Sequence, residues 1–467
     1  MPIDRKLIRS VALLVPVTLT GCAELPADRG MADVRELVSA RSGHEIVAAD
    51  QNTAALVSEL IKAPLDLDGA VKVALLNNPQ VRGEYARVGL ASADVYDAGR
   101  LSNPRFSTAA LTSNAAGAAD QVTFGLAQSF TDLLLLPART RLAAGEFERA
   151  KQSAGHAIFN LSAEVEGAFF NLLGAQKITA MRQKIARAAQ AAAELAERLA
   201  TAGNVSARDL AQAQAAASSA QLSALQAAAD SATAYTRLNA LLGLSADQVD
   251  WQVANLLPVP LARENDLAEL QKLAESRLDL AAQRREVALL TDSLNTTRRY
   301  RYVGAVEVGV VTERETDRSR ITGPSLALEL PIFNQGAGKV ARAEALVEQA
   351  ESALKALELE VANKVKLAAD RVHAARERAA LIHTRLIPER EEVVRRMQQE
   401  VSFMLEGQFA LLQVKQQEYD AYQAYLEAVR DYWVASAELT REVGTRLPSQ
   451  TVQPIDKSSA HAEGETP

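Results

Sequence analysis

The sequence predicts a mainly α-helical fold with a small β part and an internal two-fold repeat. Two long stretches, residues 137–200 and 336–402, space apolar side chains three or four residues apart, as amphipathic helices do. Two pairs of shorter segments alternate apolar with small or polar residues, as strands do. The same order of helix, strand, strand, long helix, turn and helix occurs twice, about 200 residues apart.

The composition agrees with this fold class and excludes several functions. Apolar residues make up 48 % of the 467 residues, but only 10 Phe, 9 Tyr and 2 Trp are aromatic, which favours closely packed helices over a thick core. The single cysteine, Cys22, excludes a disulfide framework and a cysteine-rich metal site. A net charge of -7 gives no basic footprint for nucleic acid, and the five histidines are scattered. We therefore expect no enzyme activity, cofactor, metal site or nucleic-acid partner.

Residues 1–21 read as a signal peptide of the lipoprotein type. A basic start and a short apolar run lead into Leu19-Thr20-Gly21-Cys22, which resembles the bacterial lipobox. Cys22 would then be acylated and become the first residue of the mature chain. Ala23 is compatible with sorting to the outer membrane. The alternative is an ordinary secretory signal with a chance cysteine, although no clean Ala-x-Ala site is present.

The first repeat is expected at residues 64–248, after an N-terminal tail at 22–63. Its first helix opens at Asp66 and should be broken or kinked by Pro79, which cannot donate a backbone hydrogen bond. The remaining expected elements are strands at 104–113 and 120–130, the long helix at 137–200, a turn at 202–204, and a return helix from the capping box at 206–209 to about 243.

The second repeat is expected at residues 265–447, after a linker at 249–264 marked by Pro258 and Pro260. Its expected elements are a helix at 266–299, strands at 302–310 and 324–332, the long helix at 336–402 with a kink at Pro388, a turn at 406–408, and a last helix to about 446. Residues 448–467 are polar and expected to be disordered.

The alternating segments leave two interpretations open. One apolar face and one small or polar face suit a membrane barrel with lipid outside and water inside. Four strands cannot close such a barrel, so several chains would have to share one. The other interpretation is a small soluble β domain on a coiled-coil stalk.

Several motifs in this order resemble the TolC-type outer membrane efflux protein family, over essentially the whole mature chain. The matching pieces are the lipobox, the Leu67-to-Pro79 segment, Asn103-Pro104 before the first strand, Leu330-Pro331-Ile332-Phe333-Asn334 after the fourth, and turns at Gly203 and Gly407.

The resemblance implies a lipid-anchored outer-membrane homotrimer with a 12-stranded barrel and a hollow cylinder of long antiparallel helices. It also implies docking of a periplasmic adaptor and an inner-membrane pump at the helix turns. The duct would passively conduct small molecules or metal ions from the pump to the exterior.

Four acidic residues are candidate site residues on this resemblance. Asp209 fits the family's acidic periplasmic aperture, although a cap of its own helix explains it equally well. In the second repeat Glu406 could substitute, because Ala410 and Gln413 stand where the acids would be. Inside a barrel, Glu307 and Glu329 would favour cations, provided that the strand register holds.

Two other functions fit parts of the same sequence. A duct for type I protein secretion would look alike, because the pump selects the cargo. A periplasmic coiled-coil scaffold lipoprotein without a pore would account for the long helices and the anchor. The alternating hairpins in both repeats favour the duct, since a scaffold does not need them.

Overall fold

The computed structural model describes residues 28–44, 46, 53–112, 114, 119–245, 251–254, 257–262 and 265–448. Cys22, the expected signal peptide and residues 449–467 lie outside these ranges. The chain divides into two compact units. The first comprises Met1–Asp33, Tyr85–Gln152 and Ala282–Lys355, and the second Val34–Glu84, Ser153–Ala281 and Ala356–Pro467.

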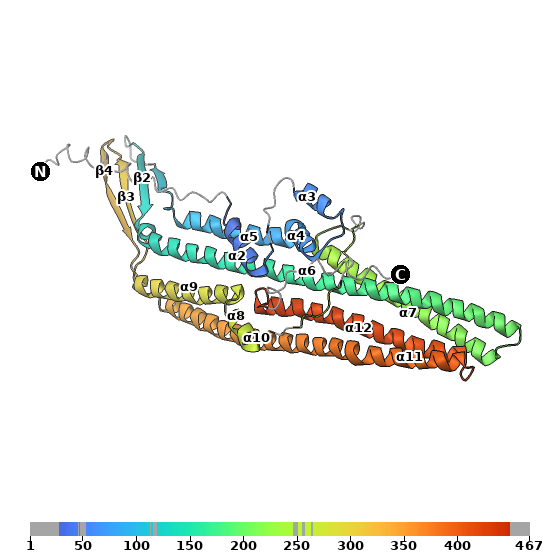
Figure 1. The fold of residues 1–467 in the computed structure, drawn as a ribbon. Helices are drawn as coiled ribbons and strands as arrows, with labels where there is room; N and C mark the ends of the chain where they lie inside the picture. Colours follow the sequence, from blue (N-terminus) through green and yellow to red (C-terminus); the bar gives the residue numbers. More distant parts are fainter. Residues whose placement is uncertain are drawn as a thin grey trace. The chain divides into compact units, whose positions relative to one another are not determined.

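The described elements repeat in order, as Figure 1 shows. In chain order they are α2 (Met31–Ser42), α3 (Thr53–Leu60), α4 (Leu67–Asn77), α5 (Pro79–Ala98), β1 (Arg105–Leu111), β2 (Gln121–Ser129), α6 (Phe130–Thr201), α7 (Ala207–Leu241), α8 (Leu267–Ala274), α9 (Leu278–Tyr300), β3 (Val306–Arg314), β4 (Arg320–Leu328), α10 (Ala337–Leu381), the π-helical turn η1 (Ile382–Leu386), α11 (Ile387–Ser402) and α12 (Gln408–Val443). The predicted fold class, mainly helical with a small β part and an internal repeat, is confirmed.

The helix break of the first repeat caps the end of its return helix. Asn78 separates α4 from α5, at the break that Pro79 predicts. The Asn78 side-chain amide donates to the carbonyl oxygen of Leu241 at 2.9 Å, and that of Asn77 donates to Gly243 at 2.7 Å. These bonds satisfy carbonyl groups that the end of α7 leaves without intrahelical partners.

The second repeat reaches the same arrangement with a different residue. The helix expected at 266–299 is two helices, α8 and α9, separated by Glu275–Arg277. The Arg277 guanidinium donates to the backbone oxygen of Glu442 at the end of α12. Arg277 thus takes the place of Asn78. A proline marks the first break, whereas the second break is indicated only by the repeat, which aligns Arg277 with Asn78.

All four strands of the first unit form one antiparallel sheet in the order β1-β2-β3-β4 (Figure 1). Pairing of β2 with β3 joins the two hairpins. Both strands of the second hairpin begin and end four residues nearer the hairpin loop than the sequence predicts, so the pairing extends to Arg314 and Arg320. Because four is an even number, every side chain keeps its predicted face of the sheet.

Both long helices contain a proline, with different outcomes. α6 begins at Phe130, earlier than expected, and Pro137 lies inside it. The second long helix is interrupted before Pro388 by η1, where the Ile387 amide donates to Ile382. A π turn of this kind widens the helix locally, so that the missing N–H group of the proline leaves the neighbouring hydrogen bonds intact.

The segment expected to be an N-terminal tail contains two helices. α2 buries Val34 and Val38, and α3 buries Val57. Both helices are short, and α2 has almost no amphipathic period, so tertiary packing rather than a sequence pattern holds them.

Among the residues that the structure describes, none of the helices combines the length and the apolar character that a transmembrane span requires.

Candidate functional site

One face of the sheet is apolar and exposed. On β1 and β2, Phe106 lies opposite Leu126, and its ring centroid is 6.3 Å from that of Phe124. On β3 and β4, Val308 lies opposite Leu326, which is 64 % exposed. A continuous apolar face of this kind normally marks an interaction surface.

The opposite face consists mainly of small and polar side chains. Ser107 lies opposite Gly125, and Ser325 lies opposite Gly309. A Cβ atom at Gly309 would lie 2.5 Å from the Leu126 carbonyl oxygen and 2.9 Å from the Ser325 hydroxyl. Small side chains therefore leave space on this face without loosening the sheet.

Glu307 lies on the small-residue face, as predicted, and it has a partner. Its carboxylate accepts a hydrogen bond at 3.0 Å from Arg105, which belongs to β1 on the far side of β2. The Glu307 side chain is one-third exposed, so the pair contacts solvent. The arginine offsets the negative charge that the sequence predicts here.

Glu329 lies one residue beyond the end of β4. Its carboxylate accepts a hydrogen bond at 3.1 Å from the Ala305 amide, just before β3 begins. Pro331 follows closely and cannot continue the ladder, because it has no N–H group. The Glu329 amide also donates to the Ala305 carbonyl oxygen at 2.9 Å, so Glu329 makes the last backbone contact between the two strands before the proline.

Asp209 completes the N-terminal cap of α7. The Ser206 hydroxyl accepts from the Asp209 amide at 3.1 Å, which confirms the predicted capping box. The hydrogen bond with Ser206 and the neighbouring Arg208 guanidinium hold the pKa of the Asp209 carboxyl below its usual range. The carboxylate therefore stays charged beside the helix turn, while the cap itself is made by the Ser206 hydroxyl.

Glu406 is exposed in the turn between α11 and α12. The three residues before it, Phe403, Met404 and Leu405, are also exposed, and Met404 is 93 % exposed in the left-handed conformation. This turn and that between α6 and α7 lie at one end of the second unit (Figure 1). The turn between α11 and α12 thus presents one charged and three apolar side chains that a partner protein could contact.

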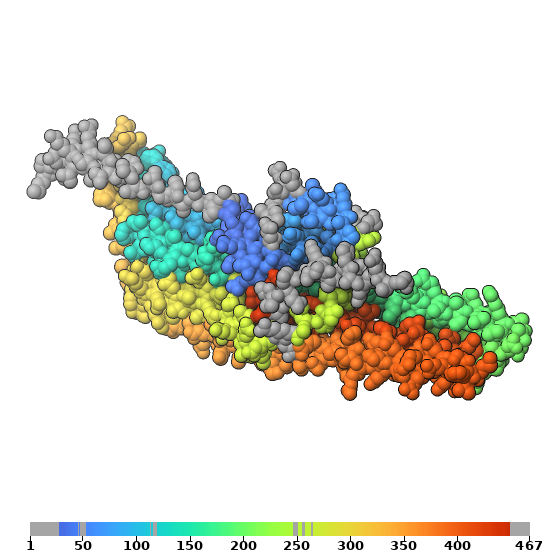
Figure 2. All heavy atoms as spheres, viewed as in Figure 1, coloured from blue at the N-terminus to red at the C-terminus, as the bar shows by residue number. Residues whose placement is uncertain are grey.

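A groove of about 620 Å³ lies between α6, α7 and α12 near the two turns. Alanines line much of it, and Phe409 packs at its edge against the alanine cluster of α6 and α7. An ion pair between Arg182 and Asp420, 3.1 Å long, joins α6 to α12. Figure 2 shows the α6–α7 turn in green and the α11–α12 turn in orange at the surface.

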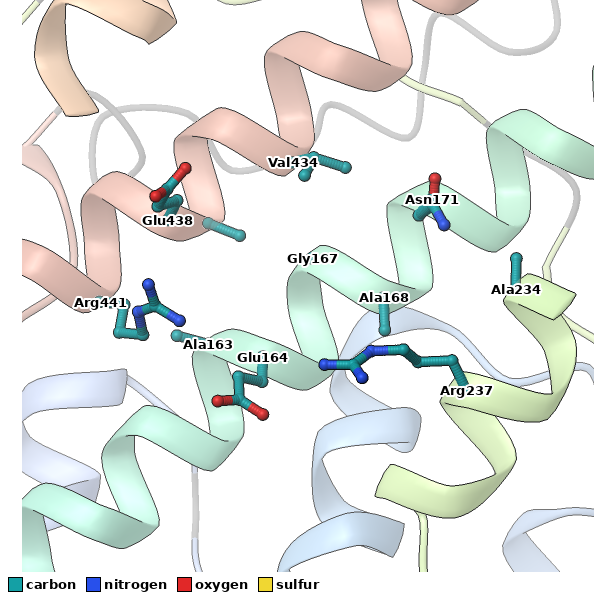
Figure 3. A pocket seen from close by; sticks show the side chains of 11 residues that line it. Ala163, Glu164, Gly167, Ala168, Asn171, Ala234, Arg237, Val434, Glu438 and Arg441 are labelled. Carbon is teal, nitrogen blue, oxygen red and sulfur yellow. The ribbon is translucent and has the colours of Figure 1, made fainter. Parts of the chain in front are cut away.

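A smaller cavity of about 330 Å³ lies further along the same three helices. Small residues of α6, among them Gly167, form its floor, and Glu164, Arg237, Glu438 and Arg441 surround it (Figure 3). No pattern in the sequence pointed to it. Because acids and bases alternate around the opening, it has no single charge that would select a ligand.

His44 is held between two carboxylates in the second unit. Its Nδ1 is 2.9 Å from Asp68 at the start of α4, and its Nε2 is 3.3 Å from Glu166 in α6. Burial by itself lowers the pKa of His44, but the hydrogen bond and charge of Glu166, helped by Asp68, raise it above the ordinary value of 6.5. The histidine therefore joins the end of α2 to two other helices.

We expect His44→Gln to lower the free energy of unfolding by about 1 kcal/mol or more at pH 6. A raised folded pKa gives stability that is present below pH 6.5 and is lost as the pH rises through the folded value. The difference from the wild type should therefore shrink by pH 9, which thermal unfolding in detergent can measure.

His156 provides the contrast for this experiment. Burial lowers the pKa of His156, so His156→Gln should gain stability relative to the wild type as the medium becomes acidic. A pH-independent effect of His44→Gln would show that the two ion pairs do not form.

Within the described residues, no group of three or more His, Cys, Asp or Glu side chains could hold a metal ion. The sequence interpretation missed Arg105 and Arg277. Arg105 could have been found, because it has the strand parity of Ser107 and therefore faces Glu307. Arg277 could also have been found, because the internal repeat aligns Leu75-x-x-Asn78-Pro79 with Ala274-x-x-Arg277-Leu278. Its partner Glu442 could not, because it is far away in sequence.

Comparisons with known proteins agree with the geometry. The family described as "Outer membrane efflux protein" matches residues 70–244. The fold is similar to that of the Campylobacter jejuni CmeC outer membrane channel, with a TM-score of 0.68 and 14 % identity over 88 % of this chain and 91 % of that chain.

Two further structures share the fold. CusC gives a TM-score of 0.68 and 16 % identity over 81 % of this chain and 92 % of that chain. The outer membrane protein VceC from Vibrio cholerae gives 0.65 and 16 %, over 81 % and 96 %. A comparison with curated protein sequences yields no significant match.

Proposed function

Since residues 70–244 match the outer membrane efflux protein family and the chain has the fold of outer membrane channels, we propose that three copies of it form a passive exit duct through the outer membrane. The observation that carries this proposal is the sheet, which has an exposed apolar face, a small-residue face and two free edges.

The two edges explain why several copies are needed. β1 and β4 each have one side without a strand partner among the described residues. Backbone groups in a bilayer must be paired, and membrane barrels have about eight strands or more. Three chains with four strands each would close a 12-stranded barrel, with the apolar face toward lipid and Glu307 toward the lumen.

The helix turns would supply the inner end of the duct. Asp209 and Glu406 would lie at the periplasmic aperture, and the exposed side chains of Phe403, Met404 and Leu405 would contact a periplasmic adaptor. The adaptor would connect the duct to an inner-membrane pump, which selects the small molecules or metal ions to be exported.

A lipid on Cys22 would supply a second anchor besides the barrel. We expect Cys22→Ala to lose acylation completely, as measured by incorporation of labelled palmitate, while part of the protein still enters the membrane. Triacylation would otherwise be sufficient for stable anchoring by itself. Release of all Cys22→Ala protein into the soluble fraction would show that the sheet does not insert.

The pair of Glu307 and Arg105 predicts the ion selectivity of the duct. In planar bilayers the wild type should conduct ions, with little selectivity contributed by this pair because its charges offset each other. Arg105→Gln should raise the cation-to-anion permeability ratio by roughly twofold, and Glu307→Gln should lower it similarly. Reversal potentials in a salt gradient measure both.

The same recordings test the proposal as a whole. Glu348→Gln, in α10 outside the sheet, is a control that removes one negative charge and should leave the permeability ratio unchanged. A protein that gives no conductance in any bilayer would contradict the duct. If the protein conducts but neither Arg105→Gln nor Glu307→Gln changes the permeability ratio, this pair does not face the lumen.

A further inference from the structure

The apolar face of the sheet ends in a pair of arginines. Along the second hairpin, the paired side chains on this face change from apolar to hydroxyl to cationic. The pairs are Val306–Leu328, Val308–Leu326, Val310–Pro324, Thr312–Thr322 and Arg314–Arg320. The eight steps from the first pair to the last correspond to roughly 27 Å along the strand. At the tilt of about 40° that membrane-barrel strands have, this is roughly 20 Å of height, which places the arginine pair near the edge of an apolar band about 25 Å tall.

The two arginines lie directly opposite each other without a neutralising partner. Like charges in this cross-strand position destabilise a sheet. Neither the Arg314 nor the Arg320 side chain makes an ion pair or hydrogen bond within the described residues, and both are exposed. The β2 residue opposite Arg314 is Val122, which offers no counter-charge.

Nearby acidic residues have other positions. Glu313 belongs to the opposite face by strand parity and accepts a hydrogen bond from Gln121. Asp317, in the hairpin loop, accepts from the Ser319 amide at 2.7 Å. Glu315 and Asp120 are also near, but neither makes an ion pair with Arg314 or Arg320. Within the described residues the repulsion between the two arginines is therefore left for an anion from outside the chain to relieve.

The helix end of the same unit shows where the other boundary of the face lies. The Arg100 guanidinium lies 3.9 Å from the Tyr96 ring centroid, just before β1. The Arg301 guanidinium lies 4.4 Å from the Tyr302 ring centroid, just before β3. Amphipathic aromatic side chains of this kind are typical of a membrane–water interface. The arginine pair is at the opposite end of the strands.

We propose that Arg314 and Arg320 together bind the phosphate group of a lipid headgroup at the outer surface of the membrane. The inference rests on the proposed function, because it requires the apolar face to contact lipid. Guanidinium groups suit this ligand, since each can offer two parallel hydrogen bonds to phosphate oxygens. A lipid fits better than free phosphate, because its acyl chains would cover the apolar side chains below the pair.

The test measures binding of a bisphosphorylated glycolipid, lipid A, to the full-length protein in neutral detergent. We expect the double variant Arg314→Gln/Arg320→Gln to bind lipid A roughly tenfold more weakly or worse. Arg318→Gln removes one positive charge from the hairpin loop outside the paired positions, and it should bind lipid A as the wild type does, whereas Arg314→Gln and Arg320→Gln, each of which also removes one charge, should each weaken binding.

Two further measurements identify the ligand. Lipid A without its phosphates should bind the wild type as weakly as lipid A binds the double variant. Inorganic phosphate at millimolar concentration should not displace lipid A. Displacement would overturn the lipid assignment, and equal binding by wild type and double variant would overturn the site.

Conductance in phosphatidylcholine bilayers separates this inference from the proposed function. The double variant should still insert and conduct there. If the wild type conducts but the double variant binds lipid A normally, only the headgroup site is wrong. If the wild type neither inserts nor conducts, the duct fails and the headgroup site fails with it.

Discussion

Gly309→Ala is expected to destabilise the assembled protein by about 1–3 kcal/mol per chain. The new Cβ would lie 2.5 Å from the Leu126 carbonyl oxygen and 3.0 Å from the Ala127 Cα, both in the backbone of β2. Backbone in the centre of a sheet cannot move aside as a flexible side chain can. The pairing of β2 with β3, which joins the two hairpins, would therefore weaken.

Gly323→Ala is the matched control. Gly323 lies in β4 on the same face of the sheet, and a Cβ there would have no atom within 4 Å. This variant should be neutral or slightly stabilising, because alanine costs less conformational entropy than glycine in a strand. The temperature at which each variant unfolds in detergent measures both effects. Equal temperatures for the two variants would contradict the described sheet.

Arg277→Ala should be the most damaging single change in the second unit, at about 3–5 kcal/mol. The Arg277 side chain is 7 % exposed, lies 2.8 Å from Asp279 and donates to the backbone of Glu442. Its removal would leave the Asp279 carboxylate without its arginine, while Glu442 would keep only its pair with Arg441. The end of α12 would also lose its cap.

The pH dependence of this defect identifies its cause. Burial by itself raises the pKa of Asp279, but in the wild type the hydrogen bonds and charge of Arg277 lower it below its usual range. Without Arg277 the carboxyl should take up a proton in mildly acidic buffer, so the loss of stability should shrink there. Chemical unfolding at several pH values measures the effect.

Arg395→Ala removes an exposed arginine for comparison. Its ion pair with Glu392 lies within one helix and is accessible to water, so the variant should change the free energy of unfolding by less than about 1 kcal/mol. Similar losses for Arg277→Ala and Arg395→Ala would show that the Arg277 network does not stabilise the chain.

The sequence predicted the elements whose signals are local. The capping box at Ser206 and Asp209 formed because its hydrogen bonds join residues three apart. Alternation predicted both faces of the sheet correctly, and the four-residue shift of the second hairpin preserved them. The predicted strands ended too far from the loop because Arg314 and Arg320 resemble loop residues in the sequence, although their backbones belong to the strands.

The sequence did not predict features that depend on distant partners. The division between α8 and α9 follows from Arg277, whose partner Glu442 is 165 positions away. The charge of Glu307 was predicted without its partner Arg105, 202 positions away. Such pairs leave no period or spacing in the sequence. The candidate site was therefore predicted as separate acidic residues, without the arginines that offset or position them.

Disulfide cross-linking between chains tests the central claim, that β1 of one copy pairs with β4 of another. Cysteines would replace Ser107 or Ala109 on β1, each combined with Gly323 or Ser325 on β4. Within one chain β1 and β4 are three strand spacings apart, roughly 14 Å, which is too far for a disulfide. Any cross-link must therefore join two copies.

After oxidation in the membrane, at least one combination should give a ladder of one, two and three linked chains that ends at three. The β1 cysteine alone should give no such ladder, and an acylated Cys22 would have no free thiol to contribute. Single chains in every combination, or products that continue beyond three chains, would contradict a barrel closed by three copies.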